Sequence, residues 1–163
     1  MNNFDDLFEQ QPQKEAALQK PEGQKERPKR QWWQIREEKQ RKEAYASLDK
    51  IFGAFAEGNG NMEAYLDVQS RFPFHSARNA LLIGAQCPQA QRVGGYKEWT
   101  AQGIEILEEE KRLPIIILEP GKAYRRDDGS IGQNFYAKEV YDISQTSAQG
   151  QYQPQVIKEV GLK

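Results

Sequence analysis

The sequence predicts an α+β domain in which N-terminal helices pack on a small, mainly antiparallel sheet. Apolar side chains recur at helical spacing as far as residue 103, and from residue 104 they alternate as in strands. The turn sequence Asp127-Asp128-Gly129-Ser130 then predicts a hairpin. We expect a disordered tail over residues 1–35, the domain over residues 36–146 and a C-terminal tail over residues 147–163.

Three helices and a short fourth account for the first part. A long helix is expected from Arg36, with an apolar stripe of Tyr45, Leu48, Ile51, Phe52 and Phe55. The next helix is capped by Asn61, carries Met62, Tyr65, Leu66 and Phe72, and ends at Pro73. The third starts after Ser76 and ends at Cys87-Pro88, and it is apolar around most of its circumference, as is typical of a helix at the centre of a core. A short helix with Tyr96 and Trp99 follows the turn at Gly94-Gly95.

The second part of the domain is expected to be extended. Ile104 and Ile106 alternate with polar residues, and a run from Leu113 to Leu118 is bounded by Pro120-Gly121. The three adjacent carboxylates Glu108 to Glu110 lie in the turn between these segments. A last strand carries Phe135, Ala137, Tyr141 and Ile143 and ends near Ser144-Gln145-Thr146.

Length and composition exclude several classes of protein. The 163 residues suit one domain, and the formal net charge of −1 indicates no polyanionic partner by bulk attraction. A single cysteine cannot form an internal disulfide and suits a reducing compartment. No apolar run approaches the ~20 residues that span a bilayer, so we expect a soluble, cytoplasmic protein that does not contact a membrane.

The N-terminal segment offers two possible contacts with partners. Phe4 to Phe8, reading FDDLF, has the form of a short motif that docks on a protein, but the composition of the segment favours a solvated tail with two incidental aromatics. Lys25, Arg27, Lys29 and Arg30 precede Trp32 and Trp33. Cations beside rings suit nucleic acid, and the two tryptophans could instead anchor the tail to the domain.

Catalytic machinery is sparse. His75 is the only histidine and Cys87 the only thiol, so Cys/His zinc sites and HExxH helices cannot form. The two residues lie at opposite ends of one expected helix, which places them too far apart for a Cys–His dyad. No GxxxxGK[ST], GxGxxG or GxSxG sequence occurs. We therefore expect no enzyme, no cofactor and no metal site.

The central stretch carries a resemblance to a known family. The matching residues are Tyr65-Leu66, Ser70-Arg71-Phe72, Ser76, Asn79, Leu81-Leu82-Ile83, Gln86, Pro88, Ala90, Val93, Gly95-Tyr96, Trp99 and Gly103, followed by Ile115 to Pro120 and Val140 to Thr146. In this order they resemble the N-terminal domain of ArdC-type antirestriction proteins and of LtrC-like proteins of conjugative elements. The resemblance implies a module that binds single-stranded DNA, here without the metallopeptidase-like domain that follows it in many relatives. One turn departs from the pattern: where the family has a basic, glycine-bearing turn, this chain has Leu107 to Arg112 with three glutamates.

Binding a single strand needs cations along the backbone and exposed rings for the bases. The candidate DNA-binding residues are Arg71, Phe74, His75, Arg78, Asn79, Arg92, Tyr96, Trp99 and Lys111. Several have a structural alternative: core packing for Tyr96 and Trp99, a hydrogen bond to a neighbouring segment for Asn79, and helix capping for His75. The acidic turn leaves a second function open, a protein-interaction adaptor that has lost affinity for DNA.

Overall fold

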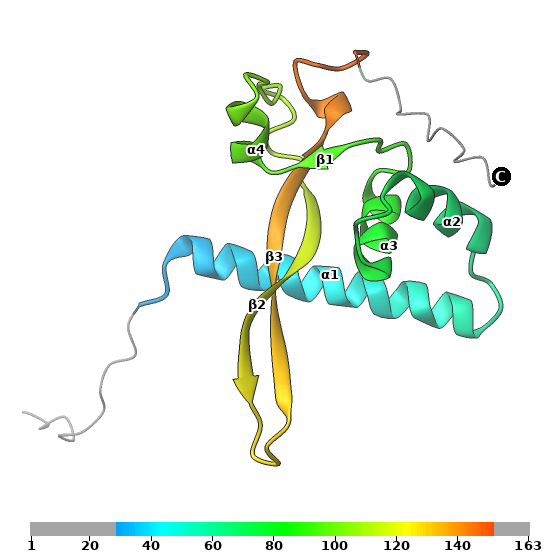
Figure 1. The fold of residues 1–163 in the computed structure, drawn as a ribbon, viewed down its shortest axis with the longest axis vertical. Helices are drawn as coiled ribbons and strands as arrows, with labels where there is room; N and C mark the ends of the chain where they lie inside the picture. The colour runs from blue at the N-terminus through cyan, green and yellow to red at the C-terminus, as the bar shows by residue number, and fades with distance from the viewer. Residues whose placement is uncertain (1–28, 152–163) are drawn as a thin grey trace, which may run out of the picture.

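The computed structural model describes residues 29–151, and in this part of the chain it contains four α-helices and a three-stranded antiparallel sheet with strand order β1-β3-β2. The α+β class is therefore confirmed. The elements are α1 (Trp32–Ala56), α2 (Met62–Arg71), α3 (Ala77–Gln86), β1 (Val93–Gly94), α4 (Tyr96–Ala101), β2 (Ile115–Arg125), β3 (Ile131–Asp142) and the 3₁₀ turn η2 (Ile143–Gln145) (Figure 1).

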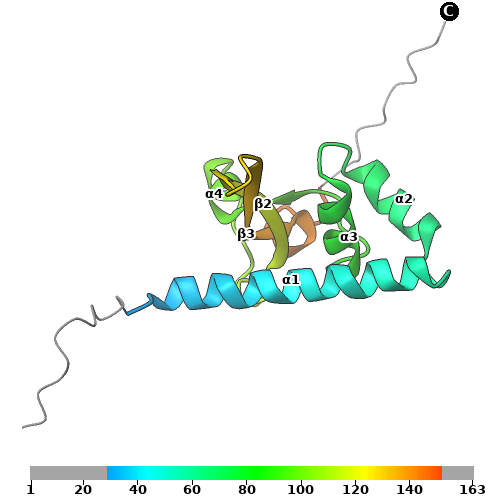
Figure 2. The same ribbon diagram turned by 90° about the horizontal axis from the view of Figure 1, so that it is seen from below.

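Helix α2 packs on one face of the sheet and α1 on the other, and α3 contributes side chains to both. On one face Ile115 and Ile117 of β2, with Val140 of β3, pack against Ile83 of α3 and Phe72 at the end of α2. On the other face Leu118 packs with Leu48 of α1. Figure 2 shows α1 running along this second face, past the sheet and towards α2. The core is thus two apolar layers separated by the sheet, as expected when a sheet buries both faces.

Helix α3 also closes the free edge of the sheet. Strand β2 is an edge strand, and its unpaired main-chain groups would otherwise face a neighbouring molecule or water. The Asn79 amide accepts from the N–H of Leu118 and donates to its carbonyl, both at 2.9 Å. The Gln86 amide makes the same pair of bonds with Ile116, at 2.9 and 2.8 Å. Two amide side chains two helical turns apart therefore stand in for a fourth strand.

The β2–β3 hairpin extends well beyond the helices, and its outer part projects away from α1 in Figure 1. We call residues 119–136 the hairpin arm. The predicted end of the strand at Pro120-Gly121 is wrong, because β2 continues to Arg125 through an irregularity between Pro120 and Ala123. Proline is tolerated there because β2 is an edge strand and the irregularity interrupts the ladder. The turn at Asp127 to Ser130 is confirmed, with Gly129 at a positive φ of 84°.

The first two helices bury narrower faces than their apolar residues suggested. Helix α1 begins at Trp32, four residues before the expected start, with Gln31 and Gln34 forming a capping box. Leu48 is buried, but Tyr45 and Phe52 are exposed, since a 25-residue helix runs past the sheet that it covers. On α2 the buried residue is Val68, whereas Met62 and Leu66 are more than half exposed.

Some expectations fall at or beyond the described ends. Trp32 and Trp33 are 71% and 55% exposed, so they are not buried anchors of the N-terminal segment. Ala148 is buried in the cluster around Trp99, within the segment that we expected to be a tail. The FDDLF motif, Lys25 and Arg27 lie outside the described residues. No helix in the described part of the chain is both long and apolar enough to cross a bilayer.

Candidate nucleic-acid interface

Two hollows lie side by side at the loop that joins α2 to α3, and both are lined by Phe74 and His75. The smaller, of about 210 Å³, is also lined by Arg71 and Arg92. The larger, of about 680 Å³, is also lined by Arg78. The structure thus brings together five of the predicted site residues from α2, α3 and the segment before β1.

Hydrogen bonds from nearby residues hold this loop, and the cap at Ser76 is the one that the sequence predicted. The Ser76 hydroxyl accepts from the N–H of Asn79 at 3.2 Å and caps α3. The Gln69 amide donates to the carbonyls of Phe72 and His75, at 2.9 and 3.2 Å, which holds the loop against α2. Phe74 stands between these fixed points and is fully exposed, at 100%. An apolar ring without any cover is unusual on a folded surface and is the clearest sign of a contact site here.

His75 is half-buried beside Phe74. Its ring meets the Phe72 ring edge-on, with 5.6 Å between centroids. Burial lowers the pKa of His75, and the carboxylates of Glu119 and Glu98 oppose this only in part. The imidazole is therefore neutral near pH 7 and takes up a proton only at a lower pH than an unperturbed histidine does.

Arg78 is the cation best placed for an anionic ligand. Its guanidinium lies over the Phe135 ring, with Cζ 4.4 Å from the centroid. It forms no ion pair with any residue between 29 and 151, so its charge is not neutralised within the described protein. A guanidinium that lies over a ring makes no hydrogen bond to it, so its N–H groups remain available for phosphate oxygens.

Arg71 and Arg92 have structural contacts as well. Arg71 donates to the carbonyls of Pro88 and Ala90 and pairs with Asp67, so it ties α2 to the segment after α3. Arg92 donates to the Gln102 side chain at 2.8 Å and lies over the Trp99 ring at 5.0 Å. Carbonyl and amide partners do not cancel charge, so Arg92 contributes its full positive potential, whereas the exposed carboxylate of Asp67 offsets part of that of Arg71.

The carboxylates near the hollows are largely neutralised. Lys138 on β3 bonds to Glu98 and Glu119, each at 3.0 Å. The second oxygen of Glu119 accepts from the Tyr136 hydroxyl at 2.8 Å, and this bond is the main cause of the raised pKa of Tyr136. Among the residues that line the two hollows, three are arginines and one, Glu119, is a carboxylate, so the lining keeps a small positive excess while His75 is neutral.

The other four predicted site residues offer no free ring or polar group to this surface. Trp99 is 1% exposed and its indole N–H donates to the Tyr141 carbonyl at 2.9 Å, so the prediction of a ring that stacks on bases is wrong and the packing alternative holds. Asn79 lines the larger hollow, but its amide is fully used on β2. Tyr96 is 54% exposed but lines neither hollow, and Lys111 pairs with Glu108 in the acidic turn, which also lines neither.

Sequence reasoning missed the residues that complete the site from the sheet. Phe135 and Glu119 belong to the hairpin and line the larger hollow, and Lys138 of the same hairpin pairs with Glu119; only the strand register brings these residues together. It also missed Asp142, which is 1% exposed and whose carboxylate accepts from the N–H groups of Gln91 and Arg92 at 2.8 and 3.0 Å. That buried carboxylate fixes the main chain from which the Arg92 side chain projects. The alternation of polar and apolar residues in the strands was the available signal.

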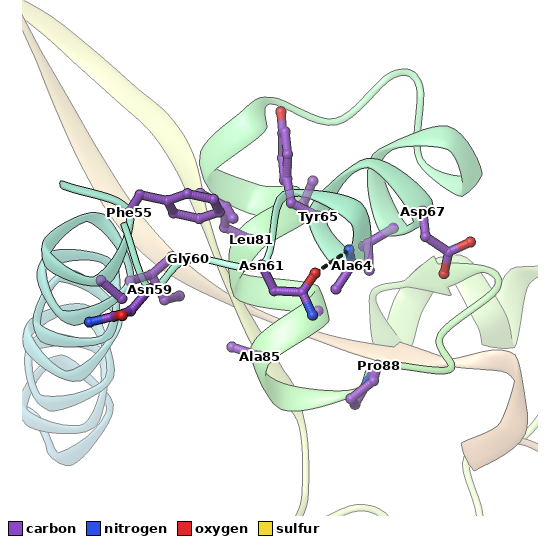
Figure 3. Close-up of a pocket in the computed structure, with 15 residues that line it drawn as sticks. Phe55, Asn59, Gly60, Asn61, Ala64, Tyr65, Asp67, Leu81, Ala85 and Pro88 are labelled. Atoms are coloured by element: carbon purple, nitrogen blue, oxygen red, sulfur yellow. Dashed lines mark hydrogen bonds between the residues drawn. The ribbon is translucent and has the colours of Figure 1, made fainter. Parts of the chain in front are cut away.

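A third hollow, of about 370 Å³, lies between the end of α1 and helices α2 and α3 (Figure 3). Phe55, Tyr65 and Leu81 are among its lining residues, and Asn61 at its rim caps α2 by accepting from the N–H of Ala64 at 2.9 Å. Its lining contains no lysine or arginine and one carboxylate, Asp67. An apolar lining without cations suits an apolar group and not a phosphate backbone.

The groups that could support covalent or metal chemistry are few. Burial is the main cause of the raised pKa of the Cys87 thiol, which keeps it protonated and weakly nucleophilic. Among residues 29–151 no three His, Cys, Asp or Glu side chains gather as metal ligands.

Comparisons with protein-family models, with curated proteins and with solved structures found no match for this chain.

Proposed function

We propose that this protein binds single-stranded DNA on the surface formed by the two hollows around Phe74 and His75. One observation carries the proposal: a fully exposed phenylalanine ring stands between arginines that line the hollows on either side of it. Binding a single strand without sequence preference needs this combination, because cations follow the backbone and ring faces receive the bases.

The contacts of each residue indicate its role in binding. Arg78, stacked on Phe135 and free of ion pairs within the described chain, is the principal phosphate contact. Arg71 and Arg92 are held by carbonyl and amide groups, and they add positive electrostatic potential and further contacts with the phosphates. Phe74 receives a base on its open face. The charge excess is small, so affinity should be moderate and should depend strongly on salt.

The resemblance to ArdC-type and LtrC-like proteins implies the same activity and a setting for it. In that setting the protein acts in the cytoplasm during conjugative transfer of a mobile element or in protection from restriction. The acidic turn at Glu108 to Glu110, the main departure from the family, lines neither hollow, so it does not oppose this path of the strand.

The test is a fluorescence-polarisation titration of a labelled oligothymidylate at several salt concentrations. The logarithm of the binding constant should fall with the logarithm of salt, with a slope near −0.7 for each phosphate contact. Arg78→Ala should weaken binding to all base sequences alike and flatten that slope by about 0.7. Lys50→Ala, an exposed cation on α1 away from the hollows, is the matched control and should change neither.

Phe74→Ala separates binding from folding. Because the ring is fully exposed, its removal should leave the free energy of unfolding within about 0.5 kcal/mol of wild type. A stacked base is worth about 1–3 kcal/mol, so affinity should fall at least about fivefold. Unchanged affinity in both Phe74→Ala and Arg78→Ala would contradict the proposal.

The second candidate is the protein-interaction adaptor. The apolar hollow in Figure 3 favours it, because such a lining fits a partner's apolar side chain. A folded wild-type protein that shows no salt-sensitive binding to single strands at low ionic strength would leave the adaptor as the function to pursue.

A further inference from the structure

One face of the hairpin arm continues the candidate site outwards. Alternate residues of a strand share a face, so Gly132, Tyr136 and Lys138 of β3 lie on one side of the sheet. Strand register places Glu119 opposite Tyr136 and Tyr124 opposite Gly132. Since Glu119 also lines the larger hollow, this face leads from the hollow to the tip of the arm.

Tyr124 lies flat on this face. A Cβ atom built on Gly132 would fall 2.4 Å from the Cζ atom of the Tyr124 ring, so only glycine leaves the ring room to lie against the opposite strand. The residue is still 44% exposed. The guanidinium of Arg126, held by the Ser130 hydroxyl and the Ile131 carbonyl, lies 5.7 Å from the ring centroid. The result is an aromatic platform with a cation beside it.

Tyr136 is the second ring on the same path. It is 41% exposed, and its hydroxyl bonds to one oxygen of Glu119, while Lys138 takes the other. Both oxygens of the one carboxylate on this path therefore have partners. The outer arm adds Lys122 as an exposed cation, whereas Arg125, opposite Ile131, lies on the other face. Rings at intervals with cations between them match single-stranded nucleic acid better than a protein surface.

We infer that a single strand bound at the hollows continues along this face of the arm and stacks a base on Tyr124. The inference rests on the proposed function and specifies the path of the strand. A purely structural role, in which the Tyr124 ring covers the bare backbone at Gly132, is the competing explanation and predicts no effect on DNA.

Gly132→Ala tests this without removing any ring or charge. The added methyl group must displace the end of the Tyr124 side chain, which is flexible enough to move without unfolding the arm. Gly132→Ala and Tyr124→Leu should each weaken binding of a 16-nucleotide oligothymidylate at least about fivefold, and Tyr124→Phe should retain affinity. Ile131→Ala, an exposed residue paired with Arg125 on the opposite face, is the matched control.

Oligonucleotide length and crosslinking distinguish the two proposals. With an oligonucleotide of about 4 nucleotides, Phe74→Ala should lower affinity while the arm variants change it less than about twofold. Photocrosslinking of a 4-thiothymidine oligonucleotide, mapped by mass spectrometry, should label Tyr124 or Tyr136. Crosslinks confined to the hollows, with arm variants that bind as wild type, would overturn the arm path and leave the proposed function standing. Absence of binding by the wild-type protein would overturn both.

Discussion

Replacing Asn79 by alanine should destabilise the protein far more than replacing Gln86, although both amides make the same pair of bonds to β2. The Leu118 main chain that Asn79 serves is buried, and Asn79 itself is only 8% exposed. Asn79→Ala strips the Leu118 N–H and carbonyl of these partners where water does not reach. Each unsatisfied buried group costs about 1–3 kcal/mol, so the free energy of unfolding should fall by roughly 2–6 kcal/mol.

Gln86 provides the matched control. It is exposed, and Ile116 is only partly buried, so water can replace the lost amide. Gln86→Ala should therefore cost less than about 1 kcal/mol. The two substitutions remove similar chemistry from the same helix, and the difference between them isolates burial.

Urea unfolding followed by circular dichroism measures this difference. Small domains lose about 1–3 kcal/mol of stability per molar urea, so Asn79→Ala should lower the midpoint by roughly 1–3 M. The Gln86→Ala midpoint should stay within about 0.5 M of wild type. An Asn79→Ala protein as stable as wild type, or a Gln86→Ala protein equally damaged, would refute the view that α3 closes the edge of β2 through buried amide bonds.

Three other predictions concern the core and the site. Leu82→Ala should cost about 2–5 kcal/mol because Leu82 is 1% exposed, whereas half-buried Leu81 should cost clearly less, as urea midpoints will show. Burial lowers the pKa of His75 in the folded protein, so below pH ~6.5 the unfolded state binds a proton that the folded state does not. The free energy of unfolding should therefore decrease as the pH falls below ~6.5 and should not depend on His75 above that pH. His75→Gln should reduce this dependence on pH. Affinity for DNA should rise as His75 gains its proton, and an affinity that does not change with pH would show that His75 does not face the strand. Arg71→Lys should lower the free energy of unfolding by about 1.5–3 kcal/mol because the bonds to two carbonyls are lost, and it should leave the salt dependence of DNA binding unchanged. A changed salt dependence with unchanged stability would show that Arg71 contacts phosphate and does not hold the fold.

The elements that depend on neighbouring residues could be predicted from the sequence alone. Asn61 and Ser76 cap α2 and α3 as expected, because a side-chain oxygen three residues before a free N–H is a local relation. The turn at Asp127 to Ser130 likewise depends on the left-handed conformation that Gly129 adopts at low cost. Alternation in the strands and helical spacing before them were sufficient for the α+β class.

The sequence also selected most of the residues that meet at the candidate site, yet not their roles. Arg71, Phe74, His75, Arg78 and Arg92 line the two hollows as a group. They lie within 22 positions of the chain, around one loop, so local proximity made them identifiable. Which of them is committed to the fold depends on segments that the local pattern does not contain.

Those roles depend on the tertiary structure, because the partners are distant in sequence. The buried Trp99 donates a hydrogen bond to the carbonyl of Tyr141, 42 residues away, and the Asn79 amide bonds to the main chain of Leu118, 39 residues away. Lys138 and Glu119 face the site only because the register of β2 and β3 puts them there, and a shift of one residue would move both to the opposite face. A side chain's spacing along an element indicates which face it occupies, and the neighbouring element determines whether that face is a core or a surface.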